Sequence, residues 1–264
     1  MPRHDAPDAG VARQDHPGRE PLPQHKLLLV DRLKPKTLTD IIQRDDAPTK
    51  IMIVGEAFLA EHGFEGVAMH KIAQAAGQGN KYAVQYYFRD LDGLIDAIVE
   101  VRDGAAVLRR EELIQIARAK SLETDLRALL EAQLIPFAEY VDAEGRQIGA
   151  RFWLQYSLRQ DFYPPEDPRL ARGRAMYFPY TRRIAEAVDM TVDELTKLMM
   201  TPVVHIMLGA LMRRDAALAN NAEVEPLEVV VARAVVMAEA ALRAATNRGP
   251  QGRRSGSARS VRRS

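Results

Sequence analysis

Apolar residues recur three and four positions apart along most of the chain, which is the spacing of one face of an α-helix. The first clear stripe lies between Pro48 and Gly63 and consists of Ile51, Val54, Phe58 and Leu59. The same spacing continues, with Gly, Pro or Asn at the interruptions, through the ranges 69–76, 80–88, 91–118, 122–141, 145–160, 168–189, 191–220 and 226–246. No stretch alternates with a period of two beside turn residues. The sequence therefore predicts an all-α fold of about nine helices.

The two ends of the chain lack this periodicity. Residues 1–46 mix eight basic with eight acidic side chains and are rich in proline, and residues 248–264 consist largely of Arg, Ser and Gly. Segments of this composition bury too little apolar surface to offset the entropy lost on ordering. We therefore expect a disordered N-terminal segment over 1–46 and a basic disordered tail over 248–264.

Composition and charge describe an ordinary globular chain, with 47% hydrophobic and 28% charged residues. The formal charge of +1 does not by itself indicate a nucleic-acid or membrane partner. The six arginines of 248–264 stand without any acid, so the remaining chain, at +1 less those six, carries −5. The excess of basic residues is therefore confined to the tail.

Several chemistries are disfavoured by the residues present. Cysteine is absent, which excludes disulfides, cysteine-bound metals and thiol catalysis and fits a reducing cytoplasm. The six histidines offer no pair with metal-ligand spacing on one helical face, so we expect no metal site. The apolar run 27–30 is too short for a secretory signal, and the uncharged run 198–212 is too short to span a membrane. We expect a cytoplasmic protein without a membrane partner.

Two short predicted helices, at 69–76 and 80–88, are separated by Ala76-Gly77-Gln78-Gly79. Short helices joined by a glycine-containing turn are typical of the helix-turn-helix, which places its second helix in the major groove of DNA. The same spacing also occurs at packing corners of helical bundles. The spacing alone leaves both interpretations open.

The residue pattern across this region resembles the N-terminal domain of TetR-family transcriptional regulators. The matching residues are Ile51, Phe58, Leu59, Gly63, Phe64, Met69, Ile72, Ala73, Ala76, Gly77, Tyr86, Tyr87, Phe88 and Leu94. The resemblance implies a three-helix helix-turn-helix DNA-binding domain over 47–92 and a helical-bundle ligand-binding and dimerisation domain over 93–247. It further implies a homodimer that binds a palindromic double-stranded DNA operator, acts as a repressor and is released by a hydrophobic small-molecule effector.

This chain departs from the family pattern in two places. Val67-Ala68 stands where the family usually has Ser or Thr, and the segment 78–85 is one residue longer. Side chains that pair with bases or phosphates are nevertheless present. The candidates for DNA contact are His70, Lys71, Gln78, Asn80, Lys81, Tyr82, Gln85 and Tyr86. Residues 47–95 hold four basic against five acidic residues, so the arginine tail or the basic residues before Pro48 would supplement the phosphate contacts.

Aromatic residues and methionines are concentrated in the second predicted domain. In a regulator of this build the resemblance implies an effector cavity there, and a mostly apolar wall suits a hydrophobic ligand. The candidate wall residues are Phe137, Tyr140, Trp153, Tyr156, Tyr177, Met200 and His205. The alternative interpretation is that these side chains form ordinary core.

The last two predicted helices are apolar on more than one side, which indicates burial on both sides. The resemblance implies a four-helix interface between two subunits, with candidate residues Val203, Met207, Leu211, Leu227, Val231, Ala234, Ala238 and Leu242. Burial within one subunit is the alternative. A different class of function, a helical ligand-binding protein or enzyme that does not regulate transcription, also stays open. Against an enzyme stand the lack of a glycine-rich phosphate loop, of a nucleophile beside a histidine and of paired inward carboxylates.

Overall fold

The computed structural model describes residues 26–160, 168–198 and 202–246, with side chains described throughout these ranges except at 160 and 168–177. These ranges form eleven α-helices and no β-strand, which confirms the predicted all-α class for this part of the chain. The helices are α1 Leu38–Ile42, α2 Ala47–His62, α3 Met69–Ala75, α4 Ala83–Phe88, α5 Leu91–Ala119, α6 Leu126–Ala138, α7 Ile148–Gln160, α8 Pro168–Ala187, α9 Val192–Leu198, α10 Val204–Ala219 and α11 Leu227–Thr246.

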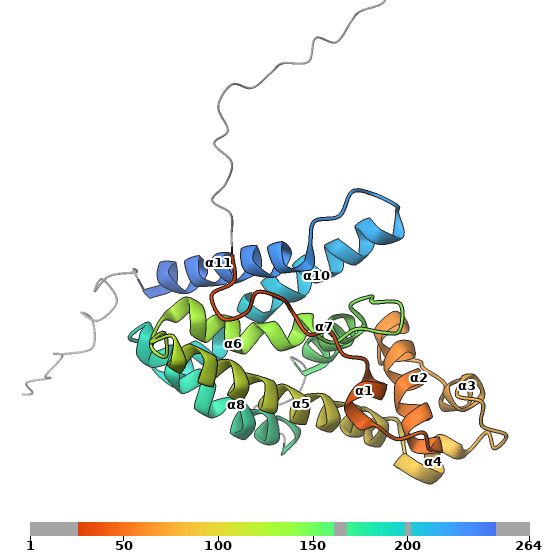
Figure 1. Cartoon of the computed structure of the whole chain (residues 1–264). Helices are drawn as coiled ribbons and strands as arrows, with labels where there is room; N and C mark the ends of the chain where they lie inside the picture. The colour runs from red at the N-terminus through yellow and green to blue at the C-terminus, as the bar shows by residue number, and fades with distance from the viewer. Residues whose placement is uncertain (1–25, 161–167, 199–201, 247–264) are drawn as a thin grey trace, which may run out of the picture.

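Three helices, α2 to α4, gather at one end of the molecule (Figure 1) and are called the head below. Asp46 begins α2 by accepting the Thr49 N–H at 3.0 Å, with a proline in the first turn. The small core of the head contains the fully buried Ile72, Ala73 and Val84. Because so few residues bury little apolar surface alone, the head also packs along α5 and α7.

The remaining helices, α5 to α11, form a bundle that is called the body below. The long helix α5 leaves the head and runs beneath α6, while α10 and α11 lie together on the opposite side of α6 (Figure 1). Asp90 and Asp125 begin α5 and α6 by accepting backbone N–H groups of Gly93 and Ala128. Every residue of α6 from Ala128 to Ala138 is buried, so α6 is the central helix of the body.

Residues 26–37, called the strap, differ from the prediction of disorder. The strap crosses α6 and α5 without helical structure and leads into α1 (Figure 1). Its own side chains Leu27, Leu29 and Leu33 are buried. The Glu131 carboxylate of α6 accepts the N–H groups of Leu28 and Leu29 at 2.8–2.9 Å. Residues 26–46 therefore belong to the ordered fold, and residues 1–25 lie outside the described residues.

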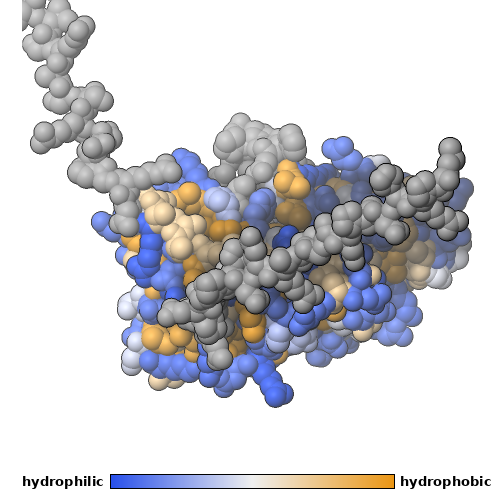
Figure 2. All heavy atoms as spheres, turned by 90° about the horizontal axis from the view of Figure 1, so that it is seen from above, coloured by the Kyte–Doolittle hydropathy of each residue, from blue (hydrophilic) through white to orange (hydrophobic). Residues whose placement is uncertain are grey.

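The expected dimer-interface residues are accounted for by packing within one chain. Seven of them have less than 2% of their surface exposed, namely Val203, Met207, Leu211, Val231, Ala234, Ala238 and Leu242, and Leu227 is half-buried. These side chains fill the contacts among α6, α10 and α11. The exposed apolar residues of α11 are others, among them Val229 and Met237. Figure 2 looks down on this side of the molecule and shows apolar patches between hydrophilic ones.

Within the ranges that the structure describes, no helix combines the length and the apolar character needed to cross a membrane.

Candidate nucleic-acid interface and interior aromatic cluster

Helix α4 buries one face and exposes the other. Ala83 and Val84 face the core of the head, while Tyr82 and Tyr86 expose 56% and 78% of their surface. Gln85 and Lys81 are exposed beside them. Exposed tyrosines in such a proportion are unusual on a small helix, because phenol rings normally bury much of their area. This face therefore offers aromatic, amide and cationic groups that can bind an extended polar surface.

Two of the candidates from the sequence make hydrogen bonds to nearby backbone groups in the turn before α4. Gln78 Nε2 donates to the Ala76 carbonyl oxygen at 3.0 Å, and the Asn80 side-chain oxygen accepts the Tyr82 N–H at 2.9 Å. Asn80 thereby forms an Asx turn that begins α4 at Ala83, three residues later than the sequence predicted. Gln78 and Asn80 consequently shape the turn, whatever else they contact.

The other candidates lie on α3 and at the end of α4. His70 and Lys71 are exposed on α3, and Ala68, which precedes this helix, makes no side-chain hydrogen bond to it. The candidates from the sequence did not include Tyr87, which is 43% exposed and whose ring lies edge-on to that of Tyr86 at 4.9 Å between centroids. Tyr86, Tyr87 and Phe88 are three consecutive aromatic residues, so the sequence did not show that Tyr86 and Tyr87 are exposed while Phe88 is half-buried.

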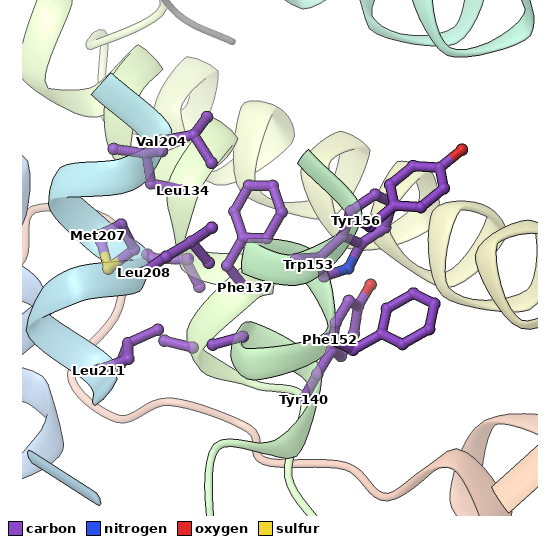
Figure 3. Close-up of a cluster of buried hydrophobic side chains, with 14 of the residues drawn as sticks. Leu134, Phe137, Tyr140, Phe152, Trp153, Tyr156, Val204, Met207, Leu208 and Leu211 are labelled. Carbon is purple, nitrogen blue, oxygen red and sulfur yellow. The ribbon is translucent and has the colours of Figure 1, made fainter. Parts of the chain in front are cut away.

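Aromatic side chains of α6 and α7 meet in the interior of the body. Phe137 and Trp153 lie edge-on with ring centroids 5.9 Å apart, and Trp153 and Tyr156 are 5.3 Å apart. In Figure 3 Phe137 stands between the α10 side chains around Met207 and the rings of α7. The structure thus brings together three of the predicted wall residues. Met200 and the side chain of Tyr177 lie outside the described residues.

The indole N–H of Trp153 has no hydrogen-bond partner among the described residues, although only 8% of the residue is exposed. A buried donor without an acceptor costs about 1–3 kcal/mol of stability. The described residues provide no acceptor for this N–H, so a bound molecule that carried one would remove this cost.

Tyr140, another predicted wall residue, makes its polar contacts with α5. Its hydroxyl donates to the Arg102 carbonyl oxygen at 2.8 Å, and its ring lies 4.6 Å from the Arg102 guanidinium. Burial raises the pKa of this phenol, so it remains a hydrogen-bond donor at neutral pH. Tyr140 therefore contacts α5, and Figure 3 draws it in the same buried cluster as Phe152 and Trp153.

His205 of α10 lies beside a serine of α7. Its Nε2 is 2.8 Å from Ser157 Oγ, which itself donates to the Leu154 carbonyl oxygen at 2.9 Å. The sequence argument that no nucleophile lies beside a histidine is thus wrong. The contact was missed because 48 positions separate the two residues in the sequence. A hydroxyl has one proton, so a serine that donates it to the Leu154 carbonyl can only accept from His205, in the tautomer that carries its proton on Nε2. This hydrogen bond joins α7 to α10.

A surface cleft of about 370 Å³ lies between the end of α5, the start of α6 and α8. None of the predicted ligand-wall residues lines it. Its lining mixes both signs of charge and consists of Arg118, Glu123, Thr124, Leu129, Arg183, Glu186 and Ala187.

Among the described side chains, no three His, Asp or Glu residues gather in a way that could hold a metal ion. No model of a protein family matches the chain, and no curated protein matches it.

Proposed function

We propose that this chain is a homodimeric, DNA-binding transcriptional regulator that resembles the TetR family, with α3 and α4 as its helix-turn-helix. The observation that carries the proposal is the exposed surface around α4. Gln85 and Tyr86 are exposed on this helix, which is fixed by the buried Val84, and Lys81 is exposed in the turn before it. A lysine and a glutamine can read base edges in the major groove, and tyrosine hydroxyls bind phosphates.

Alanine substitutions on α4 and in the turn before it test the DNA-binding proposal. Gln85→Ala and Lys81→Ala should each weaken binding to a selected DNA duplex by about 1–3 kcal/mol, with an unchanged far-UV circular dichroism spectrum. Lys197→Ala provides the matched control, because this lysine is 74% exposed on α9, away from the head. Equal affinity of all three variants and the wild type would remove α4 from the interface.

The proposed dimer places two copies together through the exposed face of α11. Two heads are needed because helix-turn-helix proteins read two half-sites about one helical turn, or a multiple, apart. The exposed Val229 and Met237 lie on α11 away from its buried contacts with α6 and α10. A symmetric contact between two copies would cover both residues on each subunit.

The proposed effector is a hydrophobic small molecule with a hydrogen-bond acceptor. The N–H of Trp153, for which the described part of the chain holds no acceptor, and the rings of Phe137 and Tyr156 support this choice. Because Trp153 is the single tryptophan of the chain, its fluorescence reports on this place alone. A fatty acyl, steroid-like or aromatic compound that binds here should change the fluorescence, raise the melting temperature and shift DNA affinity. A compound that changed only the first two would contradict effector regulation.

A further inference from the structure

The most completely buried charged contact between head and body is an ion pair. Arg102 Nε and Nη2 of α5 donate to the two carboxylate oxygens of Glu56 of α2, each at 2.7 Å. The two side chains are 0% and 3% exposed. A bidentate pair of this kind fixes both the distance and the angle between two helices. It also loses much stability if either partner is displaced.

Tyr140, just beyond the end of α6, covers this pair from the body side. Its ring packs on the Arg102 guanidinium, and its hydroxyl binds the carbonyl oxygen of the same residue. The third guanidinium nitrogen, Nη1, has no hydrogen-bond partner among the described residues. The negative face of the phenol ring therefore adds to the Glu56 carboxylate in offsetting the burial of this arginine.

The backbone of Tyr140 is itself held from two directions. Lys36 of the strap pairs with this segment, because its N–H donates to the Glu139 carbonyl oxygen and its own carbonyl accepts the Val141 N–H. Gly149 of α7 donates to the Tyr140 carbonyl oxygen at 3.1 Å. A Cβ at position 149 would lie 2.3 Å from the Tyr140 Cβ, so only glycine fits there. The strap, α5 and α7 thus converge on one residue next to the ion pair.

From this convergence we infer that Tyr140 is a positioning residue that locks Arg102 onto Glu56 and so holds the head at one orientation on the body. The consequence for DNA binding rests on the proposed function: a fixed orientation of each head sets the separation of the two heads of a dimer. Tyr140 would then govern how well both heads engage together, without contacting DNA.

The chain supplies a matched control for this inference. Tyr180 of α8 also directs its hydroxyl to an α5 carbonyl, that of Val107 at 3.4 Å, and its ring also faces an arginine, Arg110, at 5.9 Å. Tyr180 does not contact Arg102 or Glu56. Tyr140→Phe and Tyr180→Phe therefore each remove a phenol hydroxyl that donates to a backbone carbonyl of α5. Only the Tyr140 hydroxyl lies next to the ion pair between head and body.

The direct test measures the distance between head and body. Because the chain has no cysteine, Glu65→Cys in the head and Glu123→Cys in the body, both exposed, give two unique spin-label sites. Labelled chain is diluted into unlabelled chain so that each labelled subunit is measured alone by double electron–electron resonance. Tyr140→Phe should widen or shift the distance distribution, and Tyr180→Phe should leave it as in the wild type. Equal distributions for the two variants would overturn the inference.

A second variant covers the case in which Tyr140→Phe loses its native circular dichroism spectrum. Arg102→Lys keeps the charge but not the bidentate geometry, and it should widen the same distribution. An unchanged distribution in a folded Arg102→Lys protein would equally contradict the inference.

DNA binding gives an independent readout that separates positioning from general destabilisation. Tyr140→Phe should weaken binding to a two-half-site duplex by about two- to tenfold and leave affinity for a single half-site unchanged, since the DNA-facing side chains are untouched. Equal losses on both duplexes would indicate a merely structural role. If the wild-type chain binds no DNA, the proposed function fails, and the distance measurement still decides the inference.

Discussion

Phe64, which lies between α2 and α3 in the head, packs edge-on against Phe152 of α7, with ring centroids 5.4 Å apart. Phe152 in turn neighbours Trp153 and Tyr156, so a continuous row of rings joins the head to the interior of the body. Arg159 of α7 adds a cation over the Phe64 ring at 5.7 Å and an ion pair to Asp92 of α5 at 2.6 Å. Head and body are therefore packed together as one hydrophobic unit at this point.

The first prediction concerns this row of rings. Phe64→Ala should lower the free energy of unfolding by about 3–5 kcal/mol, because Phe64 is only 9% exposed and its removal leaves a cavity against Phe152. Phe58→Ala, at a half-buried ring stacked on His62, should cost clearly less. Urea unfolding followed by circular dichroism measures both. Equal losses would mean that Phe64 does not connect the head to the body core.

The second prediction compares two glycines. Gly149→Ala places a Cβ 2.3 Å from the Tyr140 Cβ and should destabilise the fold by about 1–3 kcal/mol. Gly104→Ala, in the middle of α5 with nothing within 4 Å of the added Cβ, should stabilise it by about 0.5–1 kcal/mol. Thermal melts of the two variants check the opposite signs. A stabilising Gly149→Ala would contradict the close approach of α7 to Tyr140.

The third prediction concerns pH and the attachment of the strap. Hydrogen bonds from Lys34 of the strap and then from Arg109 hold the pKa of Glu112 below its ordinary value of 4.5. A lowered folded pKa contributes stability that is present above the unfolded pKa and is lost as pH falls through the folded value. The difference in unfolding free energy between wild type and Glu112→Gln should therefore shrink as pH falls below 4.5.

Because Lys34 is the largest cause of this shift, Lys34→Met should reduce the pH dependence of that difference. Urea titrations at a series of pH values measure it. The same pH dependence with and without Lys34 would show that the strap does not bind Glu112 in solution.

The fourth prediction concerns the dimer. Met237→Glu puts a charge on the exposed face of α11, where a second copy would have to desolvate it, and should yield monomers. Leu108→Glu is the control, because Leu108 is 75% exposed on α5 and not on this face. Sedimentation velocity at micromolar concentration distinguishes the two outcomes. A Met237→Glu protein that sediments like the wild-type dimer would exclude this face.

The helical spacing of apolar residues was sufficient to predict the fold class and most helix positions. Helices α9 and α10 both lie in the predicted range 191–220, and residues 199–201 between them lie outside the described residues. The separate helix α1 was missed, because this short helix depends on its own cap, the reciprocal Thr37 and Asp40 hydrogen bonds. Periodicity over long windows does not detect such short elements.

The strap and the buried ion pair could not be predicted because their partners lie far away in the sequence. Leu28 reaches Glu131 across 103 positions, and Arg102 reaches Glu56 across 46. The only local signal for the strap was the apolar run 27–30, which is too short to separate from a polar tail. On α4 the exposed candidates could be chosen from residue type, whereas the local roles of Gln78 and Asn80 required the turn geometry.

The most direct test of the proposed function is selection from a random DNA duplex library by the wild-type chain, followed by footprinting of the enriched sequences. The account predicts one enriched sequence with two-fold symmetry, whose half-sites are about one helical turn, or a multiple, apart. Its affinity should fall in Gln85→Ala and not in Lys197→Ala. Recovery of no enriched sequence, or of a site without two-fold symmetry, would contradict a dimeric DNA-binding regulator.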